Sequence, residues 1–102
     1  MKEELWKEIE GFPNYSISTL GRVKNNRTGK IRKTHIDYDG YECITLSYPE
    51  GHPKYGSHDR KWFSIHFLMA QAFIPNPEGK ETIDHINRDR SDNRLENLRW
   101  VD

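Results

Sequence analysis

Alternating apolar and polar side chains dominate the first half of the chain and predict β-strands there. Residues 15–19 (YSIST) alternate and are rich in β-branched side chains, and residues 41–47 (YECITLS) follow the same pattern. Gly21 and the pair Asp39-Gly40 are turn signals, because Gly adopts a positive φ without strain. We therefore predict an antiparallel, β-rich sheet with strands at residues 15–19, 22–25, 30–36 and 41–47.

The pattern changes in the second half, where a helix is predicted between strands. Residues 61–65 read as a strand that runs into a short helix, with Ser64 as its N-cap. Two prolines stop this helix. Residues 82–85 form a further strand, and residues 99–101 are expected to pair with it across a long polar loop. Helical spacing is carried by Ile65, Leu68, Met69, Ala72 and Phe73.

These elements predict an α+β fold: an N-terminal antiparallel sheet, a short helix and a C-terminal β-hairpin. We expect a β-rich module at residues 1–48, a loop or linker rich in Gly, Pro and His at residues 49–60, and a second unit at residues 61–102. A chain of 102 residues suits one domain, or two small lobes that share a thin core.

Composition predicts a modestly stable protein with an aromatic core. Apolar residues make up 33% of the chain and aromatic residues 12%. We expect Trp6, Trp62 and Trp100 to carry much of the packing, together with several Tyr and Phe. Cys43 is the only cysteine, which excludes an intramolecular disulfide and a Cys-based zinc site. With no stretch typical of a signal peptide or membrane span, we expect a soluble, cytoplasmic protein.

The charges are balanced overall but unevenly distributed. Formal net charge is +0, yet six basic residues and no acidic one lie between Gly21 and Ile36. A basic stripe of this kind is typical of phosphate contact with DNA, although it could also be a solvated hairpin surface. The candidate DNA-binding residues are Arg22, Lys24, Arg27, Lys30, Arg32 and Lys33.

The candidate chemistry lies at Asp84 and His85, at the edge of the predicted strand 82–85. A carboxylate is a hard oxygen ligand for a divalent cation, and an imidazole is a base that titrates near neutrality. Metal-assisted phosphodiester hydrolysis needs both groups. Neighbours in a regular strand point to opposite faces, so a shared site requires the strand to end or bulge here.

Other interpretations of this loop remain open. An adjacent Asp-His pair such as Asp84-His85 often arises by chance. The alternating oxygen side chains from Asn87 resemble a calcium loop, but Asp92 stands where a Gly is needed and Leu98 where a bidentate Glu is needed. Asn and Asp side chains also bond local backbone in ordinary turns, which we expect of Asn93 and Asn97.

The ordered motifs resemble the HNH homing endonuclease family, often encoded by bacteriophages. Three runs carry this resemblance in the C-terminal part: DHIN from Asp84, DNR from Asp92 and ENLRW from Glu96. Upstream, the segment from Ile65 to Pro77 is similar to the helix before that motif. Residues 6–23 resemble a DNA-binding module that is often fused to such nucleases.

The resemblance implies roles for individual residues. Asp84 would bind Mg²⁺ or Mn²⁺, His85 would be the general base, and Asn97 would tie the loop down and help orient the site. Trp100 would belong to the hairpin core. His66 matches a recurring His before the motif, but we expect it to be a hydrogen-bonded packing residue. The remaining histidines match nothing and are expected at the surface: His35, His52 and His58.

One element of the family is expected to be missing. The resemblance implies a helix after the second hairpin strand, which supplies a second metal ligand, whereas this sequence stops at Asp102. The chain could be a fragment or a degenerate copy, or a partner chain could complete the metal site. The leading hypothesis is an HNH endonuclease or nickase acting on double-stranded DNA. Its alternatives are a non-catalytic DNA-binding protein derived from such a nuclease and a protein-interaction module.

Overall fold

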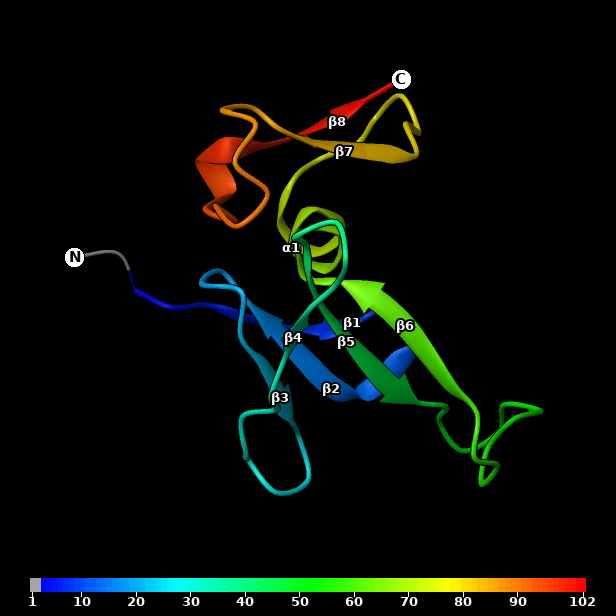
Figure 1. Cartoon of the computed structure of the whole chain (residues 1–102). Coiled ribbons are helices and arrows are strands. Elements are labelled where there is room, and N and C mark those ends of the chain that lie inside the picture. Colours follow the sequence, from blue (N-terminus) through cyan, green and yellow to red (C-terminus); the bar gives the residue numbers. More distant parts are fainter. Residues whose placement is uncertain (1–2) are drawn as a thin grey trace.

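One helix lies between two small antiparallel sheets and a β-hairpin in the computed structural model, which describes residues 3–102 (Figure 1). The α+β class predicted from the sequence is confirmed. The first sheet has the order β1-β2-β3, the second β4-β5-β6, and the hairpin consists of β7 and β8. The bounds are β1 (Trp6–Ile9), β2 (Phe12–Ser18), β3 (Val23–Asn25), β4 (His35–Ile36), β5 (Glu42–Ser47), β6 (Arg60–Ser64), α1 (Ile65–Phe73), β7 (Thr82–His85), the 3₁₀-helix η1 (Leu95–Asn97) and β8 (Leu98–Val101).

The turn between β2 and β3 forms as the sequence predicts. Ser18 is fully buried, and its Oγ accepts hydrogen bonds from the backbone N–H groups of Leu20 and Arg22, each at 3.1 Å. Gly21 has φ +80°, and a Cβ there would lie 3.2 Å from the sulfur of Met69. A larger residue at this turn would therefore meet both backbone strain and the helix beneath it. The strand β1, which pairs with β2, was not predicted from the sequence.

The predicted strand at residues 30–36 is largely wrong. Ile31 forms only an isolated bridge to Lys24 beside the first sheet, whereas β4 pairs with β5 in the second. This segment passes from one sheet to the other, so it cannot remain one straight strand. β5 is the central strand of the second sheet and also pairs with β6. This pairing brings residues from both sides of the loop at 49–60 into one sheet. The division at 1–48, 49–60 and 61–102 stays a prediction.

The centre of the core is largely aliphatic, which corrects the expectation for Trp62, whereas Phe12 and Tyr15 are buried in the core as expected of Phe and Tyr. The largest side chains with less than 2% exposure are Ile17, Ile44, Leu46, Ile65, Leu68 and Met69, whereas Trp62 is 51% exposed. Tryptophan is rarely buried completely because of its size. In this thin core the smaller branched side chains fill the space between α1 and the sheets.

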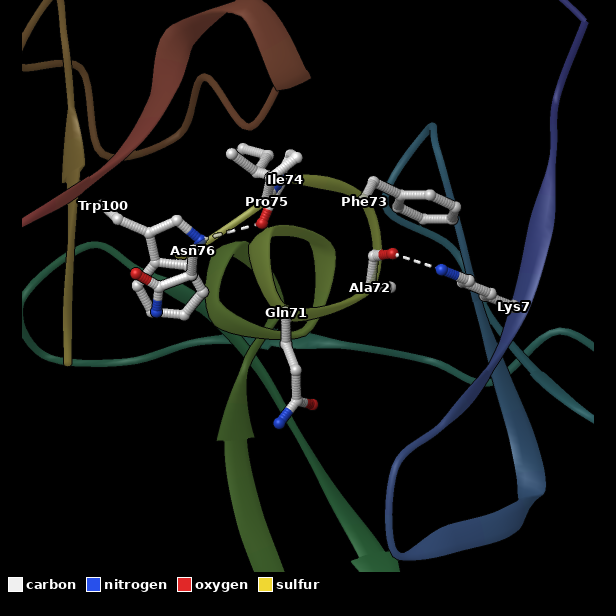
Figure 2. A pocket seen from close by; sticks show the side chains of 8 residues that line it. All are labelled: Lys7, Gln71, Ala72, Phe73, Ile74, Pro75, Asn76 and Trp100. Carbon is white, nitrogen blue, oxygen red and sulfur yellow. Dashed lines mark hydrogen bonds between the residues drawn. The ribbon is translucent and has the colours of Figure 1, made fainter. Parts of the chain in front are cut away.

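Both ends of the fold are attached to the C-terminal end of α1. The Lys7 ammonium donates to the carbonyl of Ala72 at 2.9 Å, and Trp100 Nε1–H donates to the carbonyl of Ile74 at 3.0 Å (Figure 2). The last carbonyls of a helix have no partner within it, so these two side chains satisfy groups that would otherwise need water. Ser64 occupies the N-cap position as predicted but makes no capping hydrogen bond through its side chain. No helix within residues 3–102 is long and apolar enough to cross a membrane.

We predict that Leu46→Ala lowers the free energy of unfolding by about 2–5 kcal/mol, because it leaves a cavity in the buried layer. The matched substitution Trp62→Ala, at a half-exposed side chain, should cost clearly less. Urea denaturation of both variants measures the difference. A larger loss for Trp62→Ala would contradict the aliphatic core.

Candidate active site

The candidate site is built on the β7–β8 hairpin and on the polar loop of residues 86–94. In the hairpin, Asp84 pairs with Arg99 and His85 with Leu98. The loop folds on its own side chains: Asn87 Oδ1 accepts from the N–H of Asp89 at 2.8 Å, and further turns of this kind follow. These Asx turns confirm that plain turn chemistry shapes much of the loop.

Asn97 anchors this loop and uses its whole side-chain amide to do so. It is 5% exposed. Its Oδ1 accepts from the N–H of Asn87 at 3.0 Å, and its Nδ2 donates to Asn87 Oδ1 at 2.9 Å and to the carbonyl of Asp92 at 2.8 Å. One buried side chain therefore joins the beginning and the end of the loop, which agrees with the expectation that Asn97 bonds local backbone.

His85 is buried at the end of β7, on the face of the hairpin that packs toward α1. The residue is 5% exposed; its ring lies 5.8 Å from the Tyr41 ring in a stacked arrangement and meets the His66 ring edge-on at 4.7 Å. Its Nε2 is 2.8 Å from Oδ1 of Asn93. Asn93 was expected to bond local backbone; instead its side chain connects β7 to Glu42 of β5.

Asp84 lies on the other face of the hairpin. It is the cross-strand partner of Arg99, whose Nε and Nη2 donate to Oδ2 of Asp84 at 3.1 and 2.9 Å. Because β7 is regular up to its last residue, Asp84 and His85 leave it in opposite directions. The structure therefore places His85 and Asn97 beside the loop, with Asp84 at the adjacent position of β7, where it is paired with Arg99.

A divalent cation can be accommodated at Asp84 through one carboxylate oxygen. Oδ2 is occupied by Arg99, whereas no hydrogen bond to Oδ1 is formed by residues 3–102, and the side chain is 40% exposed. Mg²⁺ commonly binds through one or two carboxylates and keeps several waters. The residues present fit such a hydrated ion. No group of three or more His, Cys, Asp or Glu residues in the described part of the chain converges on one metal position.

His66 belongs to the same buried cluster and corrects our expectation of a hydrogen-bonded packing residue. Its Nδ1 is the one buried side-chain nitrogen or oxygen in residues 3–102 without a hydrogen-bond partner. Burial, helped by repulsion from His85, lowers the pKa of His66 from 6.5 to about 4. His66 is therefore neutral at neutral pH. A His at the start of an apolar helix was the sequence signal for this position.

The basic stripe is partly engaged within the protein. Arg22 bonds to Glu4 and holds the pKa of that carboxyl down at about 2. Lys24 Nζ lies 4.2 Å from the ring centre of Trp6, and Arg32 stacks over a tyrosine of β2. The remaining members of the stripe are all exposed, and none forms an ion pair with the described residues: Arg27, Lys30 and Lys33.

Sequence reasoning missed Tyr41 and Asn93 as neighbours of His85, and Glu42 as the partner of Asn93. Asn93 and Glu42 are 51 residues apart, and no spacing rule connects a strand of the second sheet to a distant polar loop. The pattern of Asn and Asp side chains indicated the loop itself, but not which member would reach the imidazole.

Comparisons with known proteins give the site its context. Residues 64–102 match the family model described as HNH endonuclease, and residues 4–47 match the NUMOD4 motif. An uncharacterized HNH endonuclease, L247, of Acanthamoeba polyphaga mimivirus is 43% identical over 104 residues, covering 98% of this chain and 24% of that protein. The DNA endonuclease I-HmuI of Bacillus phage SP01 is 33% identical over 97 residues, covering 94% of this chain and 51% of that protein.

A solved structure titled "DNA binding and cleavage by the HNH homing endonuclease I-HmuI" has the same fold. It superimposes with a TM-score of 0.76 at 34% identity, over 95% of this chain and 52% of the other. The fold and the hairpin thus define an HNH-type nuclease scaffold. The chain carries a NUMOD4 motif followed by a region of the HNH endonuclease family, which confirms the family predicted from the sequence. It spans about half the length of the phage relatives and a quarter of the mimivirus protein.

The buried neutral state of His66 predicts an acid-sensitive fold. The pKa is about 4 in the folded protein and 6.5 in the unfolded chain, so the unfolded chain binds more protons between these values. The free energy of unfolding should fall as the pH is lowered from about 6.5 to about 4. His66→Phe keeps the aromatic packing and should remove part of this loss, measured by urea denaturation at pH 7 and pH 4.5.

The matched control is His58→Phe, in an exposed loop, which should leave the pH dependence unchanged. Identical pH dependence in His66→Phe and the parent protein would contradict the buried neutral state.

Proposed function

We propose that this chain is the DNA-positioning module and catalytic hairpin of an HNH endonuclease that hydrolyses phosphodiester bonds of double-stranded DNA. The observation that supports this most is the buried, oriented imidazole of His85 at the end of β7, in a chain that shares its fold with the HNH homing endonuclease I-HmuI. Aromatic rings and Asn93 hold this imidazole in place, as a group that accepts a proton at a defined position requires.

His85 acts as the general base. It removes a proton from water as the water oxygen attacks phosphorus, in line with the departing 3′ oxygen. General base catalysis contributes roughly 10²–10⁴-fold to a rate. Tyr41 and His66 restrict rotation of the ring, so that little orientational freedom is lost when the water and the phosphate are bound.

Asp84 is the proposed protein ligand for Mg²⁺ or Mn²⁺. Bound there, the cation supplies charge neutralisation for the phosphate and the leaving oxygen. Asp84 offers Oδ1, while the contact of Oδ2 with Arg99 fixes the direction of the carboxylate. Arg99 is itself 58% exposed and can donate to a phosphate oxygen of DNA.

The basic stripe is the proposed DNA backbone surface. Arg27, Lys30 and Lys33 are exposed and free of ion pairs with the described residues, so phosphates can bind them without breaking an internal contact. Arg22, Lys24 and Arg32 are held near aromatic rings or Glu4, which limits their reach. Such contacts supply affinity but little sequence information.

A second candidate function is DNA binding without cleavage. The ion pair between Asp84 and Arg99 favours it, because a cation must compete with a guanidinium for that carboxylate. This alternative predicts the same salt-dependent binding of DNA as the nuclease hypothesis. It differs in the absence of strand cleavage in Mg²⁺ or Mn²⁺.

We predict metal-dependent nicking of supercoiled plasmid that EDTA abolishes and that His85→Ala reduces by roughly 10²–10⁴-fold. Loss of the base accounts for the reduction, so DNA affinity should change little. His58→Ala, at an exposed loop histidine, is the matched control and should cleave like the parent protein. Absence of cleavage by the parent, with DNA binding retained, would refute the nuclease hypothesis for this chain and support the alternative.

We also predict that DNA affinity falls steeply with salt and that the double variant Lys30→Ala, Lys33→Ala flattens this dependence. Each phosphate contact contributes about −0.9 to the slope of log affinity against log salt for duplex DNA. Lys54→Ala, Lys61→Ala changes the net charge equally at exposed positions outside the stripe and serves as control. Equal slopes for the two variants would remove the stripe as the DNA surface.

A further inference from the structure

A chain of hydrogen bonds runs from the second sheet to the imidazole of His85. Thr34 Oγ1 donates to Oε2 of Glu42 at 2.5 Å, and Nδ2 of Asn93 donates to Oε1 of Glu42 at 3.4 Å. Oδ1 of Asn93 is 2.8 Å from Nε2 of His85. Glu42 belongs to β5, in the segment matched by the NUMOD4 motif, whereas Asn93 and His85 lie in the segment matched by the HNH endonuclease model.

We infer that Glu42, acting through Asn93, sets which ring nitrogen of His85 carries the proton and leaves Nδ1 as the nitrogen that accepts one. Glu42 and Asn93 are then positioning residues for the general base. Their role in catalysis rests on the proposed nuclease function, whereas their effect on the imidazole does not depend on it.

The direction of these hydrogen bonds follows from which groups can donate. A carboxylate oxygen accepts hydrogen bonds, so the amide nitrogen of Asn93 must face Glu42. The carbonyl oxygen of Asn93 then faces His85, and because it only accepts, Nε2 of His85 must carry the hydrogen. The reversed amide would place its carbonyl oxygen against the Glu42 carboxylate, with two acceptors and no proton between them.

The remaining nitrogen of His85 is available to the substrate. A neutral imidazole has one donor and one acceptor, so with the proton on Nε2 the lone pair is on Nδ1. Nδ1 of His85 makes no hydrogen bond with residues 3–102. Among these residues, the one fully buried side-chain nitrogen or oxygen without a partner is Nδ1 of His66, so Nδ1 of His85 is not fully buried. It therefore reaches solvent, and a water molecule can approach it.

The ring cannot easily turn to exchange the two nitrogens. Tyr41 is stacked on His85 at 5.8 Å, and His66 contacts it edge-on at 4.7 Å. Arg90 lies over the Tyr41 ring, with its Cζ 5.0 Å from the ring centre, and its Nη1 donates to the carbonyl of Asp39. Packing thus keeps the imidazole in the orientation that Asn93 requires.

The direct test is nitrogen-15 NMR of the histidine rings in the 102-residue protein without DNA or metal, at a pH where His85 is neutral. The inference predicts that the directly bonded proton of His85 is on Nε2 and that Nδ1 has the shift of an unprotonated nitrogen. A proton on Nδ1 would overturn it. This measurement needs no variant and no cleavage, so it separates the inference from the proposed function.

A charge reversal tests the role of Glu42. Lysine donates and does not accept, so Glu42→Lys should turn the Asn93 amide around, present its NH₂ to His85 Nε2 and move the imidazole proton to Nδ1. Glu50→Lys makes the same charge change in an exposed loop and should leave the proton on Nε2. A folded Glu42→Lys protein with the proton still on Nε2 would overturn the role of Glu42.

Cleavage kinetics test the consequence for the general base. Asn93→Leu should lower kcat by at least about tenfold, up to the roughly 10²–10⁴-fold that a general base contributes, with KM for DNA nearly unchanged. Unchanged kcat in Asn93→Leu would remove Asn93 as a positioning residue. Absence of cleavage by the parent protein would refute the proposed function, and the NMR result on His85 would still decide the inference.

Discussion

The side chain of Asn97 is the constraint on which the geometry of the hairpin depends. A long polar loop has few apolar contacts to hold it, so its shape must come from hydrogen bonds. Asn97 is buried and connects the backbone of Asn87 at the start of the loop with that of Asp92 near its end. Asn93 follows directly after the anchored Asp92, and its side chain reaches His85. Without this cross-connection, the loop would gain conformational freedom, and the partner of the imidazole would no longer be placed.

Contacts through α1 and Glu42 connect the N-terminal sheets with the hairpin. α1 packs between the sheets and the hairpin, and its C-terminal carbonyls are bonded by Lys7 on one side and Trp100 on the other (Figures 1 and 2). Glu42 of the second sheet reaches the loop independently of the helix. The N-terminal sheets therefore form part of the support for the hairpin. In the proposed function, the module that contacts DNA and the catalytic imidazole of His85 are therefore held in a fixed relative position.

The sequence predicts local elements well and long-range polar contacts poorly. The strand at residues 82–85 and its pairing partner follow from β-propensity and turn signals, and α1 follows from apolar spacing. The strand expected at residues 30–36 is wrong because the crossing between sheets is a tertiary event. The contacts of His85 with Tyr41 and Asn93 depend on side-chain directions that no local pattern encodes. The family resemblance indicated Asp84, His85 and Asn97, but not the ion pair between Asp84 and Arg99.

Amide hydrogen exchange at Asn87 tests the role of Asn97 most directly, because the N–H of Asn87 donates to the Asn97 side chain and to no other described group. We predict protection of this amide in the parent protein and a loss of at least about fivefold in Asn97→Ala, while the amides of β2 keep theirs. Asn76→Ala, which removes a similar side-chain bridge to Lys80, is the control and should leave Asn87 protected. Equal protection of Asn87 in Asn97→Ala and the parent protein would contradict the account.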